Sequence, residues 1–372
     1  MLNFIYYPIS AVMRFWREVL TFAGMPHDSG VTWLLAIVLL TATVKAILTY
    51  PTVRSIRSSR RMQEITPKIQ AVRERYKNDK TKLAEETQKI YKEAGFNPLA
   101  SCLPMLVQLP VFLGIFHVIR SFNRTGTQFG APGLTVEQNR ETANYFFTVD
   151  DVQSFLDARI FGVPLSSFMN MPAEQFRAFN DASFGRPDIV MVAVPFVILI
   201  ALFTHLNARY TLGRQKQRQA SGKQAAPTGD NAEMMAMQQN MMGSMMLWVM
   251  PAMTIATGFI WPIGLLAYML TNTLWTFVQT RLTYGVMDRE EEKEDAIKRE
   301  KAQATAPAPG ARKVDNRTKK QRRQDALRNQ GSTSAEVQEL IDAAAEQPVQ
   351  DLPAVDRAAA QRARSQAKKK RK

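Results

Sequence analysis

The fold is decided by the stretch from Val31 to Val53, which reads VTWLLAIVLLTATVKAILTYPTV. At about 1.5 Å per residue in a helix, a stretch of this length covers about 34 Å, enough to cross the hydrocarbon core of a bilayer. Lys45 is the only charged residue in it. We therefore predict a transmembrane helix at 31–53.

Four further apolar stretches are long enough to be transmembrane helices. They lie at about 98–119, 189–205, 240–259 and 263–282, the last two separated by a turn at Ile260, Trp261 and Pro262. Prolines within them are compatible with spans, because neighbouring helices in a bundle re-satisfy the freed backbone groups. The expected fold class is an all-α integral membrane protein with a five-helix transmembrane bundle.

The segments around these spans complete the expected organisation. In chain order we predict an N-terminal amphipathic interfacial helix (1–30), a first span (31–53), a cytoplasmic helical hairpin (54–95), a second span (96–122), an extracytoplasmic connection (123–186), a third span (187–206), a cytoplasmic loop (207–239), the fourth and fifth spans (240–284) and a basic, mostly disordered cytoplasmic tail (285–372).

The orientation in the membrane follows from the Lys and Arg residues of the connections. There are 12 in residues 54–95, 5 in 207–239 and 21 from 289 onward, whereas the 64-residue connection 123–186 holds 5 beside 7 Asp plus Glu. Basic residues are concentrated on the cytoplasmic side. We therefore expect a multi-pass membrane protein with its N-terminus outside and its C-terminus in the cytoplasm.

The overall composition hides this organisation. The formal net charge of +15 and mean hydropathy of −0.20 are those of a basic soluble protein, because the polar tail dilutes the apolar spans. A single Cys and three widely spaced His residues argue against disulfides and against metal sites built on these residues. Nucleotide-binding, metalloprotease and serine-hydrolase signatures are absent from the sequence.

The N-terminal segment has the pattern of an interfacial helix. Val12, Phe15, Trp16, Val19 and Phe22 fall on one side at helical spacing, in a segment that also carries charged residues. A signal peptide is the competing interpretation, although no basic start precedes the apolar stretch.

The cytoplasmic segment 54–95 has the pattern of two short packed helices. Met62, Ile65, Ile69, Val72 and Tyr76 recur at steps of three and four, giving a narrow apolar seam on a charged helix. We predict a helical hairpin, which is either a solvated loop or a docking surface.

Lys45 is the residue of the first span that most needs an explanation. A lysine at membrane depth costs about 2.5 to 3.5 kcal/mol on insertion scales and usually faces a cavity. Thr41 is one turn earlier on the same face, and Gln108 and Asn272 add polar groups from other spans. We predict a polar, positively charged interior; the alternative is that Lys45 reaches the cytoplasmic interface.

Two stretches strongly resemble the YidC/Oxa/Alb family of membrane protein insertases. Residues 41–117 read TATVKAILTYPTVRSIRSSRRMQEITPKIQAVRERYKNDKTKLAEETQKIYKEAGFNPLASCLPMLVQLPVFLGIFH, and residues 259–280 read FIWPIGLLAYMLTNTLWTFVQT. The ordered pairs Asn97-Pro98, Cys102-x-Pro104 and Gln108-x-Pro110 make the resemblance specific.

The resemblance implies a hydrophilic groove, open to the cytoplasm and to lipid, that receives nascent membrane proteins and releases their apolar segments sideways. It places Thr41, Tyr268 and Met269 against the substrate helix and Gln108 in the groove. The family usually has an arginine where this chain has Lys45, which keeps the charge but loses the planar donor fork. The large extracytoplasmic domain of some members is absent.

The resemblance also implies partners. We expect nascent membrane proteins as substrates, cooperation with the Sec translocon, and no cofactor, covalent catalysis or DNA binding. The basic clusters from Arg312 to Arg328 and from Lys368 to Lys372 are expected to bind either ribosomal RNA or anionic lipid.

We also predict a short helix at about 335–345 within the tail.

Two other function classes remain open from the sequence. A small-solute channel or transporter would use the same polar interior, but it predicts an internal repeat, and none is visible. The second open class is a purely structural protein that assembles with a translocon.

Overall fold

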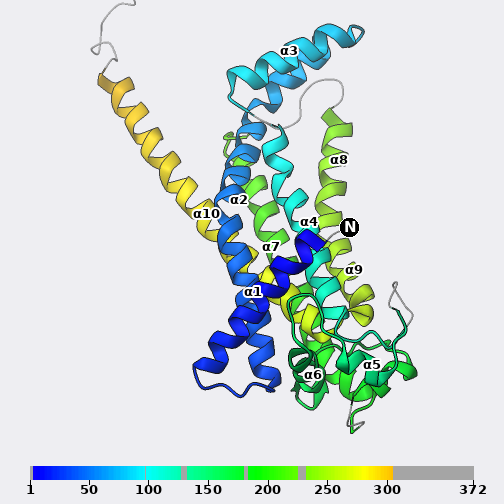
Figure 1. The fold of residues 1–372 in the computed structure, drawn as a ribbon. Coiled ribbons are helices and arrows are strands. Elements are labelled where there is room, and N and C mark those ends of the chain that lie inside the picture. Colours follow the sequence, from blue (N-terminus) through cyan, green and yellow to red (C-terminus); the bar gives the residue numbers. More distant parts are fainter. Residues whose placement is uncertain (1–2, 97, 127–131, 180–182, 225–231, 305–372) are drawn as a thin grey trace, which may run out of the picture. The chain divides into compact units, whose positions relative to one another are not determined.

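The computed structural model describes residues 3–96, 98–126, 132–179, 183–224 and 232–304 (Figure 1). The chain divides into two compact units, Met1–Glu294 and Asp295–Lys372, and only the first ten residues of the second are described. The described part is mostly helical. The helix predicted at 335–345 and both basic clusters of the tail lie outside the described residues.

The first two helices pack on each other. Helix α1 (Asn3–Phe22) contacts both α2 (Gly30–Arg75) and α4 (Pro98–Arg120). Ser29 begins α2 as its N-cap, with its hydroxyl oxygen accepting a hydrogen bond from the Val31 amide. Helix α2 then continues through Pro51 and Pro67 without a break, so the predicted first span and the first arm of the predicted hairpin are one helix of 46 residues.

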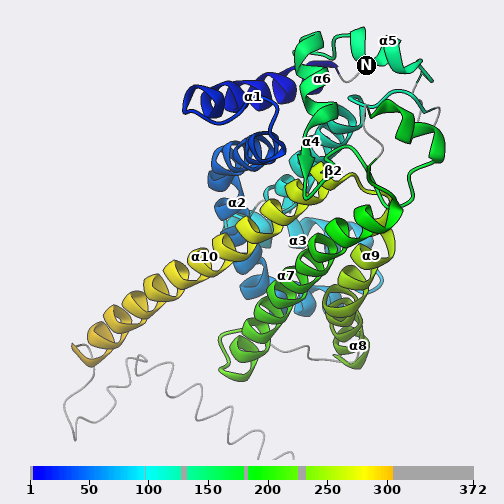
Figure 2. The same cartoon turned by 90° about the horizontal axis from the view of Figure 1, so that it is seen from below.

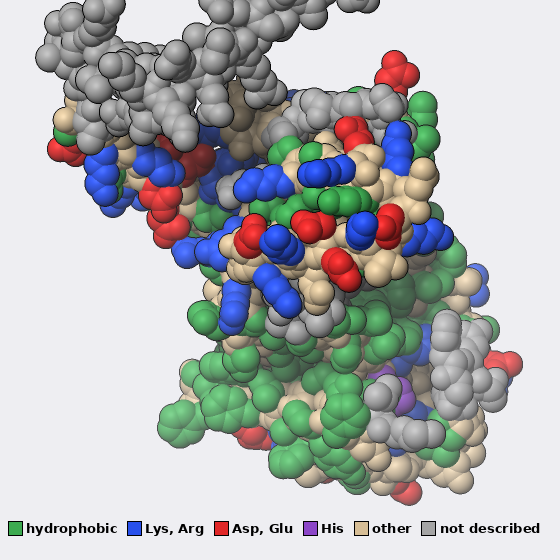
Figure 3. Space-filling view, turned by 90° about the horizontal axis from the view of Figure 1, so that it is seen from above, with side chains coloured by type: hydrophobic (Ala, Val, Ile, Leu, Met, Phe, Trp, Pro, Cys, Tyr) green, Lys and Arg blue, Asp and Glu red, His purple; other side chains and the backbone are tan. Residues whose placement is uncertain are grey.

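Helix α3 (Lys80–Glu93) folds back on the end of α2. Asp79 caps its first turn, and Gly95 ends it with a φ of 59°, in the left-handed region that glycine tolerates. Ile65 and Ile69 of α2 are buried against Phe96, so the apolar seam lies between the two helices. In Figure 3, charged side chains of both signs crowd over this end of the first unit, beside a broad hydrophobic surface.

The connection after α4 is a small folded region. It contains α5 (Val136–Glu141), α6 (Val149–Asp157), an antiparallel pair of two-residue strands, β1 (Arg159–Ile160) and β2 (Val163–Pro164), and the 3-10 helix η2 (Ala173–Ala178). The sequence predicts neither these helices nor the strands, because each is too short to show a periodic pattern.

The remaining helices complete the first unit. Helix α7 spans Arg186–Ala220; α8 (Ala232–Ser244) continues through a π-helical turn, η3 (Met245–Val249), into α9 (Met250–Thr257) and η4 (Gly258–Ile260). After a turn at Trp261 and Pro262, α10 spans Ile263–Ala304. Figure 2 shows α7 and α9 side by side, and they contact each other.

The predicted basic, mostly disordered tail (285–372) begins as a helix in the structure. Residues 285–304 continue α10. This segment is rich in Glu, Lys, Arg and Ala, which favour helix, and places Glu294 and Asp295 four residues before Lys298 and Arg299.

Three helices of the described chain are long and apolar enough to cross a membrane. They cover Gly30–Gln63, Arg186–Ala220 and Ala232–Ile260, and a shorter apolar helix covers Leu106–Arg120. The first unit is therefore a helical membrane domain.

An aromatic core joins α2 to α6 and to the residues that follow α4. The Trp33 ring is fully buried and meets Phe122 and Phe155 edge-on, and its indole N–H donates a 3.0 Å hydrogen bond to the Ser154 hydroxyl. The guanidinium of Arg17 lies 4.8 Å from the centre of the Trp33 ring.

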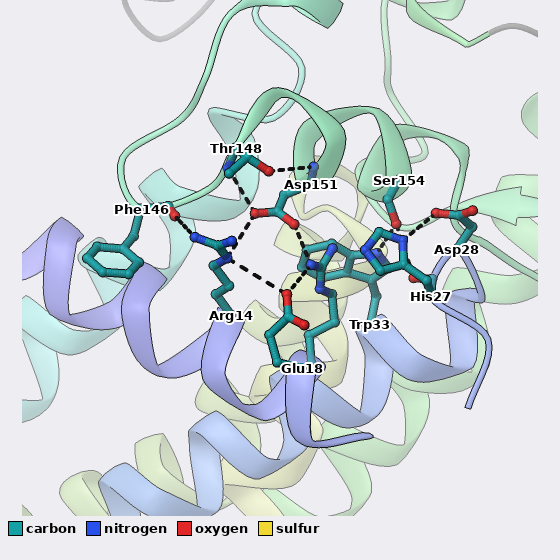
Figure 4. Close-up of polar contacts among 10 residues, drawn as sticks. Arg14, Glu18, His27, Asp28, Trp33, Phe146, Thr148, Asp151 and Ser154 are labelled. Carbon is teal, nitrogen blue, oxygen red and sulfur yellow. Dashed lines mark hydrogen bonds and ion pairs between the residues drawn. The ribbon is translucent and has the colours of Figure 1, made fainter. Parts of the chain in front are cut away.

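A cluster of charges ties α1 to the first turn of α6 (Figure 4). Arg14 and Arg17 of α1 both form ion pairs with Asp151, and both also contact Glu18. Asp151 accepts a 2.8 Å hydrogen bond from the Thr148 amide as part of the capping box of α6. One carboxylate therefore both caps a helix and holds α1.

A second cluster of charges joins α2, α7 and α10. Glu291 of α10 forms ion pairs with Arg60, Arg218 and Lys223, and Asp288 accepts a 2.5 Å hydrogen bond from Arg214. These contacts join α2 and α10 to the end of α7.

Candidate functional site

Lys45 lies on α2, half-buried between two other helices. Its ammonium Nζ donates hydrogen bonds to Gln108 Oε1 of α4 at 3.2 Å and to Thr276 Oγ1 of α10 at 3.4 Å. Among the described residues, no carboxylate forms an ion pair with it. The positive charge is therefore held by neutral oxygens.

Gln108 extends this contact to a third side chain. Its Nε2 donates a 2.6 Å hydrogen bond to the hydroxyl of Tyr268, which is 3% exposed. The connected set Thr276, Lys45, Gln108 and Tyr268 forms a polar chain across α2, α4 and α10.

Beside this polar chain lies a cavity of about 310 Å³ between α4 and α10. Its wall combines the polar and apolar side chains of Gln108, Leu109, Phe112, Tyr268, Met269 and Asn272. Asn272 Oδ1 is buried and accepts no hydrogen bond from the described residues, so an acceptor remains available at the cavity.

The six predicted site residues divide into three groups. Lys45, Gln108 and Tyr268 are brought into one hydrogen-bonded set, and Met269 and Asn272 line the adjoining cavity. Thr41 is 1% exposed, and its hydroxyl donates a 2.7 Å hydrogen bond to the Ile37 carbonyl, so it contributes no free polar group.

Sequence reasoning missed Thr276. Its spacing could have indicated it as a site residue. Thr276 follows the predicted site residue Asn272 by four positions and therefore lies on the same face of the helix. A metal would find no ligand set here, since the described residues hold no group of three or more His, Cys, Asp or Glu side chains suited to one.

Three apolar helices among the described residues are long enough to span a bilayer, and together they define a multi-pass membrane protein. The family described as 60Kd inner membrane protein matches residues 25–291, and this chain belongs to that family.

Curated bacterial relatives extend the match over most of the chain. The proteins named "Membrane protein insertase YidC" from Mycobacterium tuberculosis and Mycolicibacterium paratuberculosis are 40% and 41% identical to it, over 84% and 85% of this chain and 80% and 84% of their own. The protein of that name from Corynebacterium efficiens is 31% identical over 78% of this chain and 69% of its own length. The chain is thus a multi-pass bacterial membrane protein.

Proposed function

We propose that this protein is a membrane protein insertase and chaperone. It receives nascent membrane proteins in a polar, positively charged groove around Lys45 and releases their transmembrane segments sideways into the bilayer. The single observation that carries the proposal is the Lys45 ammonium, held within a membrane-spanning helix by Gln108 and Thr276. The names of its relatives agree with this function.

The physical argument concerns the polar tail of a client protein. Bringing an acidic segment into hydrocarbon costs several kcal/mol unless partners receive it. A cation bonded only to neutral oxygens retains its attraction for a carboxylate, and the free acceptor of Asn272 offers a partner to an N–H group. The site lowers the cost of passage and carries out no bond chemistry.

The proposed topology has five spans, with the N-terminus outside and the C-terminus in the cytoplasm. Besides the three long apolar helices, it uses α4 and the first part of α10 as spans. The 23 residues of α4 cover about 34 Å as a helix. The groove then opens towards the cytoplasm and towards lipid.

The same proposal includes three kinds of partner. The Sec translocon would share clients with the groove, while the basic clusters Arg312–Arg328 and Lys368–Lys372 would hold either the ribosome or anionic lipid near its mouth. Loss of ribosome binding on removal of residues 305–372, with vesicle binding retained, would favour the ribosome.

The test is reconstitution of the purified full chain into liposomes with a single-span client that has an acidic translocated tail. We expect insertion without nucleotide, reduced fivefold or more in Lys45→Ala and retained in Lys45→Arg, since one charge pair at about 4 Å is worth about 1 to 4 kcal/mol. Lys68→Ala, on the exposed part of the same helix, is the matched control.

Two outcomes would contradict the proposal. Vesicles that pass ions or small solutes but insert no client would point to a channel or transporter. Equal insertion by the wild type and both Lys45 variants would leave the charge without a role.

A further inference from the structure

Helix α10 lines a second space besides the cavity beside Gln108. Leu270, Leu274, Val278 and Leu282 recur every four residues and line a crevice of about 700 Å³, which Val38 and Val53 of α2 close from the other side. The cavity beside Gln108 uses the neighbouring positions Tyr268, Met269 and Asn272. Two different faces of α10 thus line two separate spaces.

Polar contacts between α2 and α10 flank this crevice. Lys45 bonds to Thr276 at 3.4 Å, and further along Arg57 pairs with Glu290 at 2.9 Å. The side chains of Val278 and Leu282 remain 52% and 66% exposed. In a bilayer an open apolar space of this size is filled, because empty volume forfeits packing contacts.

The dimensions of the crevice select its occupant. Leu270 and Leu282 are 12 positions apart, and the rise between them of about 18 Å is close to the thickness of one hydrocarbon leaflet, about 15 Å. A transmembrane helix of 20 residues fills roughly 2,500 Å³, far more than the crevice offers. If each methylene occupies about 30 Å³, as a water molecule does, the space suits about 20 of them, the size of a long acyl chain.

Polar groups at the α3-proximal end suit the head of such a lipid. Gln279 also lines the crevice, and its buried Nε2 finds no acceptor among the described residues, so it can donate to an ester carbonyl. Arg54 directly follows Val53, is exposed, and forms no ion pair with the described residues. Glu290 neutralises only the neighbouring Arg57.

We propose that the crevice between α2 and α10 binds one phospholipid with a net negative headgroup, in the leaflet nearer α3. One acyl chain lies along Leu270 to Leu282, Gln279 donates to an ester carbonyl, and Arg54 holds the phosphate. The bound lipid can exchange with the bilayer, and its acyl chain occupies the space that separates α10 from α2.

Trp275 lines the same crevice and provides a built-in reporter. The full chain is placed in phosphatidylcholine vesicles containing phosphatidylglycerol with brominated acyl chains, because bromine quenches nearby indole emission. The signal of Trp275 is the difference between the wild type and Trp275→Phe. The matched control is the difference for Trp248→Phe, since Trp248 of η3 is 64% exposed and lies outside the crevice.

We expect half-maximal quenching of Trp275 at a fraction of brominated phosphatidylglycerol at least threefold lower than for Trp248. Arg54→Gln should abolish that difference, and brominated phosphatidylcholine should not produce it. Equal quenching of both tryptophans by both lipids would mean ordinary surrounding lipid and would overturn the proposal. Displacement of the lipid by an equimolar single-span client peptide would assign the crevice to clients instead and would also overturn it.

Discussion

The guanidinium of Arg17 and the carboxylate of Asp151 form an ion pair in which the side chains are only 1% and 2% exposed. They lie 134 positions apart in the chain, one in α1 and the other in the first turn of α6. Removing Asp151 leaves the buried Arg17 guanidinium with only the half-exposed Glu18 as an acidic partner among the described residues, which is destabilising. The N-terminal helix is thereby fastened to the connection that follows α4.

We predict that Asp151→Asn lowers the free energy of unfolding by about 3 to 5 kcal/mol. The asparagine oxygen can still accept from the Thr148 amide, so the substitution removes the charge and keeps the helix cap. Asp157→Asn is the control, because Asp157 pairs with Arg140 but is 40% exposed, and it should cost less than about 1 kcal/mol. Thermal unfolding in detergent measures both; equal losses would refute the special role of the buried pair.

Gly30 is predicted to be intolerant of any side chain. A Cβ at this position would lie 2.0 Å from the Arg159 carbonyl oxygen, a backbone atom that cannot turn away. Gly30→Ala should therefore cost about 1 to 3 kcal/mol. Gly213→Ala on α7 meets open space and should instead stabilise the helix by up to about 1 kcal/mol. Thermal unfolding in detergent compares the stability of the two variants. An unchanged stability of Gly30→Ala would disprove the close approach of residue 30 to the Arg159 backbone.

Glu291 of α10 is predicted to hold α2 and the end of α7 in place. Glu291→Gln removes the charge that Arg60, Arg218 and Lys223 share. We expect faster trypsin cleavage in residues 207–224 and a stability loss of about 1 to 2 kcal/mol, smaller in 1 M salt. Glu290→Gln breaks only a half-exposed pair and serves as the control. Identical cleavage rates for the two variants would count against this cluster.

In the polar chain, Gln108 should matter more than Tyr268. Gln108→Leu removes the acceptor for Lys45 and the donor to Tyr268, whereas Tyr268→Phe removes only the hydroxyl at the end of the chain. In the liposome assay we expect insertion of acidic-tailed clients to fall about tenfold in the first variant and about threefold in the second, corresponding to losses of about 1.4 and 0.7 kcal/mol. The reverse order would show that the tyrosine hydroxyl acts on clients independently of Lys45.

The features that sequence could predict are those with a local physical signal. Long apolar stretches and the helical seam of Met62 to Tyr76 mark helices by composition and period. Lys45 stands out because of its cost in hydrocarbon. Its partner Gln108 could be suspected as a polar residue in a span, but the bond between them joins positions 63 apart and depends on packing.

Other features lacked such a signal. Nothing near Arg17 in the sequence indicates Asp151, and the short elements between α4 and α7 follow no period. The predicted first span ends at Val53, but the helix continues past it to Arg75. The helical start of the tail was not predicted either, because its charged, alanine-rich sequence resembles a disordered segment as closely as a solvated helix.

The length of α2 has a mechanical consequence. Its 46 residues form one helix of about 69 Å. Gly30 lies against the Arg159 backbone near its start, and α3 packs on its other end. Pro51 offers no N–H to the Ile47 carbonyl, which leaves a compliant point six residues beyond Lys45. A bend of α2 at Pro51 would therefore move Lys45 relative to the part of the helix that α3 and the ion pairs of Arg57 and Arg60 hold.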